Sequence, residues 1–277
     1  MTATPATLHR IASPADRARH DRTFPRLVVS ELIKAKALPS TLWCCVLTVV
    51  MAMLITGALL GLIKHDSLGA HPLARGIAAG LTLAAAFVPI IAGCLLASIE
   101  YANNSIRTTL AATQRRLTWL SAKAVASMII QVITQLVAVI MCAIIAVITC
   151  SARGVSLTVE PRQIGWIALC VLGAVMLHLI GLALGMLTRS AAASITISVA
   201  IMWVLLTVLD MASYALPWMA HALPALPYNA LNALVGANGQ PETHSWWTSQ
   251  LGGGTVCLIW LVVLGASAAT LLKRRDA

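Results

Sequence analysis

The chain has 277 residues, of which 59% are hydrophobic and only 10% are charged, and its formal net charge is +10. Soluble domains average about 25% charged residues, so the composition excludes a soluble globular protein and predicts an integral membrane protein. In such a protein the excess of Lys and Arg indicates topology rather than nucleic-acid binding.

The amino-terminal part of the chain is basic and then amphipathic. We expect residues 1–23 to form a flexible cytoplasmic tail. Residues 24–36 follow it and should form a helix that lies on the inner leaflet, since apolar side chains gather on one sector of that helix. The apolar sector holds Phe24, Leu27, Val28, Leu32 and Ala35. Pro39 is expected to end this helix, and Ser40 to cap the first membrane span.

Six uncharged runs are long enough to cross a bilayer, whose hydrocarbon core takes roughly 20 helical residues. They lie at 42–62, 76–99, 124–149, 163–187, 191–209 and 252–272. We therefore predict an all-α integral membrane protein with one transmembrane domain over 24–273, followed by a cytoplasmic tail at 274–277. Two apolar pieces on the outer side, 214–223 and 226–235, are too short to span and predict a re-entrant or interfacial helical segment.

The distribution of basic residues predicts the topology. Fifteen of the 19 Lys and Arg residues fall on one side of the predicted bilayer and four on the other. Because loops rich in Lys and Arg stay in the cytoplasm, and an even number of spans puts both termini on the same side, both termini are predicted to be cytoplasmic.

Few polar side chains lie within the spans. His178 is the deepest ionisable group. It either lines a pathway or touches substrate, or it is a neutral imidazole whose hydrogen bond is satisfied by a backbone carbonyl or by a neighbouring span. Gln131 and Gln135 share a helical face and are candidates for contacts between helices or subunits, or with a substrate. The seven cysteines show no CxxC spacing, so neither a metal site nor disulfides are expected.

Motifs for enzymatic chemistry are absent from the sequence. It contains no GxxxxGK[ST] phosphate loop, HExxH or GxSxG, and the predicted spans hold no acidic residue. We therefore expect neither an enzyme nor a chain that binds a cofactor itself.

The connection at 100–123, EYANNSIRTTLAATQRRLTWLSAK, is too long for a tight turn and too basic for the membrane interior. Ser105 can cap a short helix that begins near Ile106, and Asn104 tolerates a left-handed backbone. Arg107, with Arg115 and Arg116, would surround such a helix. Two interpretations stay open: a docking element for a cytosolic partner, or a basic loop held by anionic lipid.

Four stretches resemble one known family. RLVVSELIKAKALPSTLW (26–43) is similar to the "E-x-x-K…(S/P)-S/T-x-W" segment of bacterial ABC type-2 exporter permeases, and 100–123 to that family's "E-Y-x-x-G-T-I/L-R-x-x-L…R-R…A-K" connection. GLALGMLTRSAAASI (181–195) and LPALPYNALN (223–232) resemble its fourth-to-fifth turn and its outer loop. In the second motif, Asn104 and Ser105 replace the usual Gly-Thr.

The resemblance implies a permease subunit in a bacterial cell membrane. Such permeases form homo- or heterodimers, sit in membrane lipid, and dock a separate cytosolic ATPase, which binds ATP and Mg²⁺ and drives alternating access. It implies export of a hydrophobic or amphipathic drug, peptide or lipid. The residues it assigns to the main coupling element are Glu100, Asn104, Ser105, Ile106, Arg107 and Leu110. It assigns Arg189 to a second, smaller contact. The alternative is a non-transporting immunity or sensory subunit that binds a peptide at its outer loop.

Glu31 is unusual because it falls in the apolar sector of the 24–36 helix, where a carboxylate finds no hydrogen bond from its neighbours. One hypothesis pairs it with a cation: Arg115, Arg116 or a basic residue of the ATPase. The alternative is a rotated helix, or a side chain that reaches water.

Cysteine accessibility tests the predicted topology. Ala70→Cys and Gln240→Cys should react with a membrane-impermeant thiol reagent added outside intact cells, because both lie in predicted outer loops. Labelling of either cysteine only after the cells are opened would contradict the six-span topology.

Overall fold

The computed structural model describes residues 24–62, 72–102, 116–154, 161–236, 246 and 249–274. Within these ranges the regular structure is helical, with no strand. Six helices are long and apolar enough to cross a membrane, which confirms the predicted multi-pass membrane protein. They are α3 (Pro39–Leu62), α4 (Pro72–Ala102), α6 (Arg116–Ala152), α7 (Pro161–Thr188), the bent helix over Ala191–Ala215, and α11 (Gln250–Arg274).

Helices α4 and α7 form the centre of the bundle and are the most extensively buried of the six. Glycines allow their backbones to touch. A side chain at Gly181 of α7 would collide with the carbonyl oxygen of Ile90 in α4, and one at Gly93 with the carbonyl oxygen of His178. Close contact between small residues is a main source of helix association in membranes, where the hydrophobic effect does not drive it.

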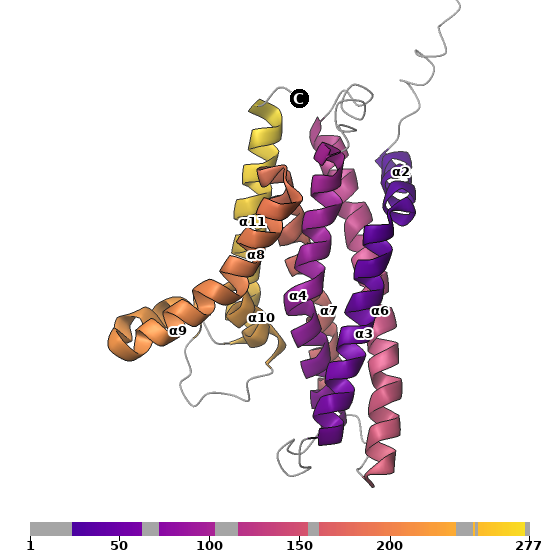
Figure 1. The fold of residues 1–277 in the computed structure, drawn as a ribbon, viewed down its shortest axis with the longest axis vertical. Coiled ribbons are helices and arrows are strands. Elements are labelled where there is room, and N and C mark those ends of the chain that lie inside the picture. The colour runs from indigo at the N-terminus through magenta and orange to yellow at the C-terminus, as the bar shows by residue number, and fades with distance from the viewer. Residues whose placement is uncertain are drawn as a thin grey trace, which may run out of the picture.

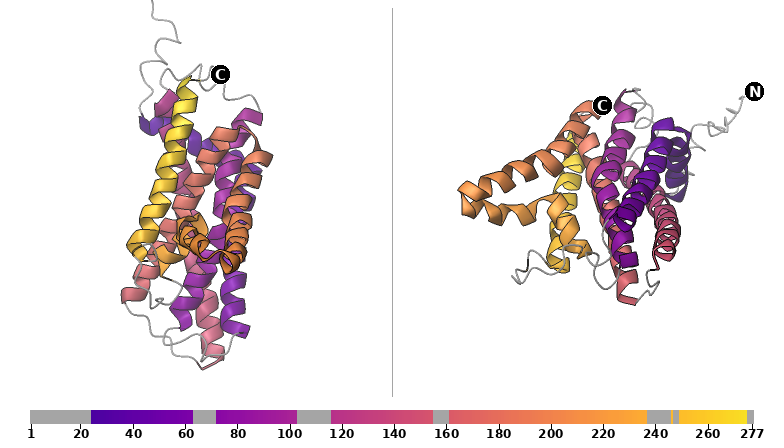
Figure 2. Two further views of the ribbon diagram at one scale, coloured as in Figure 1. Left: turned by 90° about the vertical axis from the view of Figure 1, so that its left-hand side faces the viewer. Right: turned by 60° about the horizontal axis from the view of Figure 1, so that its bottom comes forward.

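The amino-terminal helix α2 (Phe24–Ala37) lies across one end of the bundle, whereas α3 runs along it (Figures 1 and 2). Its apolar sector packs on α6, where Val28 contacts a cluster that includes Ala122 and Ala126. The helix breaks at Leu38, the residue before a proline, where helical geometry is disfavoured. Pro39 therefore begins α3, and Ser40 lies inside α3; the predicted cap at Ser40 was wrong.

The bent helix leaves the bundle as an arm. It comprises α8 (Ala191–Val199), a π-helical turn η2 (Ala200–Val204) and α9 (Leu205–Ala215), which contains no buried residue. Figures 1 and 2 show α9 projecting from the bundle. The 3-10 helix η3 (Pro217–Ala225) returns the chain, and α10 (Pro227–Val235) packs on α7 and α11. The two short apolar pieces, 214–223 and 226–235, fall largely within α9, η3 and α10, and their re-entrant or interfacial placement on the outer side stays a prediction.

The described basic residues separate between the two ends of the bundle. One end gathers α2, the last turns of α4, α7 and α11, and the first turn of α6 (Figure 1). That end, called here the α2 end, carries Arg26, Lys34, Lys36, Arg116, Lys123, Arg189, Lys273 and Arg274. The opposite end carries Arg75, Arg153 and Arg162. The grouping agrees with the predicted topology, and which end faces the cytoplasm stays a prediction.

The α4–α7 contact can be tested with two alanine substitutions in α7. Gly181→Ala should destabilise the protein by about 1–3 kcal/mol, because its Cβ meets backbone rather than a movable side chain. Gly165→Ala is the matched control, since its Cβ enters open space. Thermal unfolding in detergent should show a lower midpoint for Gly181→Ala alone. Equal midpoints would contradict the close packing.

Candidate functional site

Four charged side chains from three helices meet at the α2 end. Glu31 and Lys34 come from α2, Glu100 from the last turns of α4, and Lys123 from α6. The Nζ atom of Lys123 lies 2.8 Å from Oε1 of Glu100 and 3.6 Å from Oε2 of Glu31. Lys34 Nζ lies 2.6 Å from Oε1 of Glu31 and 4.0 Å from Oε1 of Glu100. We call these four residues the charge cluster.

Three of the four residues are almost inaccessible to solvent: Glu31 is 4% exposed, Glu100 6% and Lys123 3%. Removing a charge from water is costly unless it is paired and hydrogen-bonded. Lys123 meets this condition because it lies between two carboxylates. The side chain of Lys34 is 46% exposed, so it closes the cluster on the solvent side, and its own ion pair contributes less.

Trp119 supports the cluster from α6. It is one helical turn before Lys123, so the two side chains share a face. Its indole Nε1 donates a hydrogen bond to Oε1 of Glu31 at 3.3 Å. The Lys123 ammonium lies 5.7 Å from the centre of the indole ring, within cation–π range. Trp119 thus contacts both charges of the buried pair and fixes their separation.

The local sequences explain why these charges meet. Val28, Glu31 and Ala35 are the buried residues of α2 and occupy one helical face. The facing positions of α6 include Ala122 and Ala126, whose small side chains let α2 approach closely. The charged side chains of Glu31 and Lys123 then meet beside this apolar contact, where both are buried.

A cavity of about 360 Å³ adjoins the cluster. All of the residues that line it belong to α2, the α2–α3 break, α4 and α6. The charged lining residues are Glu31, Lys34, Glu100 and Lys123, and the apolar ones include Leu38 and Leu96. In the described part of the chain, no group of three or more His, Cys, Asp or Glu side chains is placed to hold a metal ion. The arrangement is suited to linking helices through charge.

The structure brings together some residues of the predicted coupling site. Glu31 and Glu100 share the charge cluster. Most of the main coupling element lies outside the described residues, namely Asn104, Ser105, Ile106, Arg107 and Leu110, and so does Arg115.

The predicted partner of Glu31 needs a correction. Glu31 does pair with cations, as one hypothesis expected, but these are Lys34 and Lys123. Arg116 instead donates a hydrogen bond to the carbonyl oxygen of Leu272 in α11 at 3.1 Å. The reason is geometric: Arg116 begins α6, about two turns before Lys123, and it points toward a different helix.

Arg189 lies in the turn between α7 and α8. Its backbone has φ of 57°, a left-handed conformation uncommon for a residue other than glycine. Its guanidinium lies 5.2 Å from the ring centre of Tyr101, which directly follows Glu100. The turn that carries Arg189 is thereby joined to the same end of α4 as the charge cluster.

The polar residues predicted within the spans, His178, Gln131 and Gln135, lie outside the charge cluster. His178 Nδ1 is 3.0 Å from the carbonyl oxygen of Pro89, the bond to a neighbouring span that one interpretation expected. Gln131 and Gln135 are buried in α6, and their Nε2 atoms have no hydrogen-bond partner among the described residues. Their proposed contact with another helix, subunit or substrate stays a prediction.

Sequence reasoning missed Lys123 and Trp119 as site residues. A signal was present, since Lys123 closes the connection that Glu100 opens, and Trp119 precedes it by four residues.

No family model matches the chain, and no curated protein matches it either. In the described part of the chain, the fold and the cluster define a multi-pass membrane protein with six helices long enough to span and a buried ionic link at one end.

Single substitutions should distinguish the contribution of the buried cation, Lys123, to stability from that of the exposed one, Lys34. Lys123→Met leaves two buried carboxylates facing each other, and the loss should be about 3–5 kcal/mol. Lys34→Met, its matched control on the exposed side, should cost about 1 kcal/mol or less. Thermal unfolding in detergent provides the comparison. Neutralising the carboxylates as well, in Lys123→Met with Glu31→Gln and Glu100→Gln, should recover part of the loss; equal effects of the two lysines would refute this account.

Proposed function

We propose that the chain is the membrane subunit of an ATP-driven exporter, of the ABC type-2 permease class that its sequence resembles. The six apolar helices are compatible with a transporter subunit. The observation that carries the proposal is the position of the charge cluster. Glu100 is the first residue, and Lys123 the last, of the 100–123 connection, which contains the segment that the resemblance assigns to ATPase docking.

The cluster gives this segment a mechanical connection to the rest of the chain. A force applied between residues 103 and 115 acts on the last turn of α4 and the first turns of α6. Both are joined to α2 through Glu31 and Lys123. Since buried ion pairs resist separation, we expect these three helix ends to move as one unit. ATP-driven closure of the docked subunits would then tilt α4 and α6, as alternating access requires.

The topology follows from the same proposal. The α2 end faces the cytoplasm, with α2 at the inner leaflet and the coupling element on the same side; the part of that element from Asn104 to Leu110 lies outside the described residues. On the outer side, η3 and α10 form the re-entrant or interfacial segment. The arm projects from the bundle, α9 buries none of its residues, and its surface carries exposed apolar side chains such as Val208, Met211 and Tyr214. We assign that surface to a second permease protomer.

The partners and ligands are proposed accordingly. The partner ATPase holds ATP and Mg²⁺, because the sequence has no phosphate loop of its own. The exported substrate is hydrophobic or amphipathic, such as a drug, a peptide or a lipid, and the compartment is a bacterial cell membrane. The observations in hand do not favour the alternative of a non-transporting immunity or sensory subunit.

Leu110→Asp tests the docking assignment. A charge placed in an apolar contact costs several kcal/mol when it is uncompensated, so the variant should insert normally yet lose the ATPase during purification from native membranes. Leu62→Asp is the control, because Leu62 is 83% exposed at the opposite end of α3. It should keep the ATPase.

Two outcomes would overturn the proposal. A Leu110→Asp variant that keeps the complete complex and its transport activity would remove the coupling-helix assignment. A wild-type chain that copurifies with no ATPase would remove the transporter function and favour a non-transporting subunit.

A further inference from the structure

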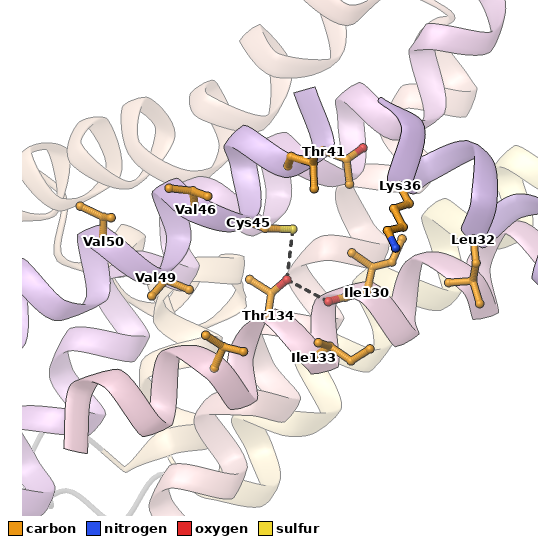
Figure 3. A pocket seen from close by; sticks show the side chains of 12 residues that line it. Leu32, Lys36, Thr41, Cys45, Val46, Val49, Val50, Ile130, Ile133 and Thr134 are labelled. Atoms are coloured by element: carbon orange, nitrogen blue, oxygen red, sulfur yellow. Dashed lines mark hydrogen bonds between the residues drawn. The ribbon is translucent and has the colours of Figure 1, made fainter. Parts of the chain in front are cut away.

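A second concavity, the lateral groove, lies on the outside of the bundle between α3, α6 and the end of α2 (Figure 3). Its volume is about 540 Å³, within the usual range for small-molecule sites. The residues that line it are Leu32, Lys36, Thr41, Leu42, Cys45, Val46, Val49, Val50, Ile130, Ile133, Thr134 and Val137.

The wall of the lateral groove is mostly apolar, and the one buried hydroxyl in it is already hydrogen-bonded. Its buried hydroxyl, Thr134 Oγ1, lies 2.9 Å from the carbonyl oxygen of Ile130 and 3.2 Å from the sulfur of Cys45 (Figure 3). The hydrogen-bonding capacity of Thr134 is therefore satisfied within the wall. Several lining side chains remain open to a ligand, including Leu42 at 53% exposed and Ile133 at 57%. Such a surface fits a hydrocarbon chain.

A single cation stands at one end of the lateral groove. Lys36 is exposed, and it forms no ion pair within the described part of the chain, in contrast to Lys34. Figure 3 shows its side chain extending from α2 into the groove. The lining contains no acidic residue. The groove therefore attracts a ligand that joins an apolar tail to an anionic head.

The length of the groove matches one bilayer leaflet. Along α3, its lining runs from Thr41 to Val50, which at 1.5 Å per residue is about 14 Å. The hydrocarbon core is about 30 Å thick, so this is about half of it. The cation lies at the end where α2 crosses the bundle and α3 begins, the level at which lysine ammonium groups reach the headgroups.

We propose that the lateral groove binds one anionic phospholipid, with an acyl chain against α3 and α6 and the phosphate on the Lys36 ammonium. The match in length, the position of the cation and the open lateral side favour a lipid over a peptide or a second copy of the chain. Basic sites between membrane helices are a known mode of headgroup recognition. This inference does not depend on the proposed transport function.

Native mass spectrometry of the purified protein tests the proposal directly. The probes are phosphatidylglycerol and phosphatidylcholine with identical acyl chains, added at equal concentration. Wild-type protein should retain one phosphatidylglycerol preferentially. Lys36→Gln should weaken that retention about tenfold, because a charge-assisted contact is lost, while Lys36→Arg should preserve it. Val46→Trp fills the groove and should abolish retention of this lipid.

Matched controls lie on α11. Lys273→Gln removes another exposed cation at the α2 end, and Val262→Trp adds the same bulk at a position that is 56% exposed in wild type. Both should retain lipid as wild type does, and thermal unfolding verifies that every variant is folded.

Three results would overturn the proposal. The first is equal retention of the two lipids by wild type, and the second is phosphatidylglycerol retention that Lys36→Gln leaves unchanged. The third is a Val46→Trp variant that keeps its lipid but loses a dimeric mass, which would assign the groove to a second copy of the chain.

Discussion

The ammonium group of Lys123 determines how one end of this protein assembles. It lies almost fully buried between the carboxylates of Glu31 and Glu100. A buried cation without its partners would be strongly destabilising, so Lys123 stays buried only while α2 and α4 both present their carboxylates. Trp119 limits the arrangement further, because its indole bonds Glu31 and faces Lys123. The ionic link therefore holds the ends of three helices, α2, α4 and α6, in one relative position.

Outside the charge cluster, the structure has a closely packed part, formed by α4 and α7, and a part with few buried residues, formed by the arm. Helices α4 and α7 touch along a glycine-lined contact, and any side chain at Gly93 or Gly181 would meet backbone. The arm formed by α8, η2 and α9 is different, since α9 buries none of its residues and the π-helical turn lies where the arm leaves the bundle. Such turns are frequent at functional sites. The charge cluster is joined to the closely packed pair through Glu100 of α4, and the arm meets the bundle where α8 packs on α4 and α7.

Much of this fold could be predicted from the sequence. The length of each hydrophobic run indicates a membrane span, and the distribution of basic residues indicates which helix ends lie at the same end of the bundle. Glu31 was also recognisable, as a carboxylate within an apolar face needs a partner. Its partner was harder to identify. Lys123 is 92 residues away in sequence, and only the packing of α2 on Ala122 and Ala126 brings it within reach. The start of α3 at Pro39 was missed because a proline can end one helix or begin the next.

If the charge cluster joins α2 to α6 as we propose, the two helices move together. Spin labels at Ile33→Cys on α2 and Leu117→Cys on α6, both exposed positions, can measure this after the seven native cysteines are replaced. Pulsed electron–electron double resonance should give one narrow distance distribution that is the same without nucleotide and with ATP, in the complex with the proposed partner ATPase. Lys123→Met should broaden it. A wild-type distance that shifts on addition of ATP would contradict the claim.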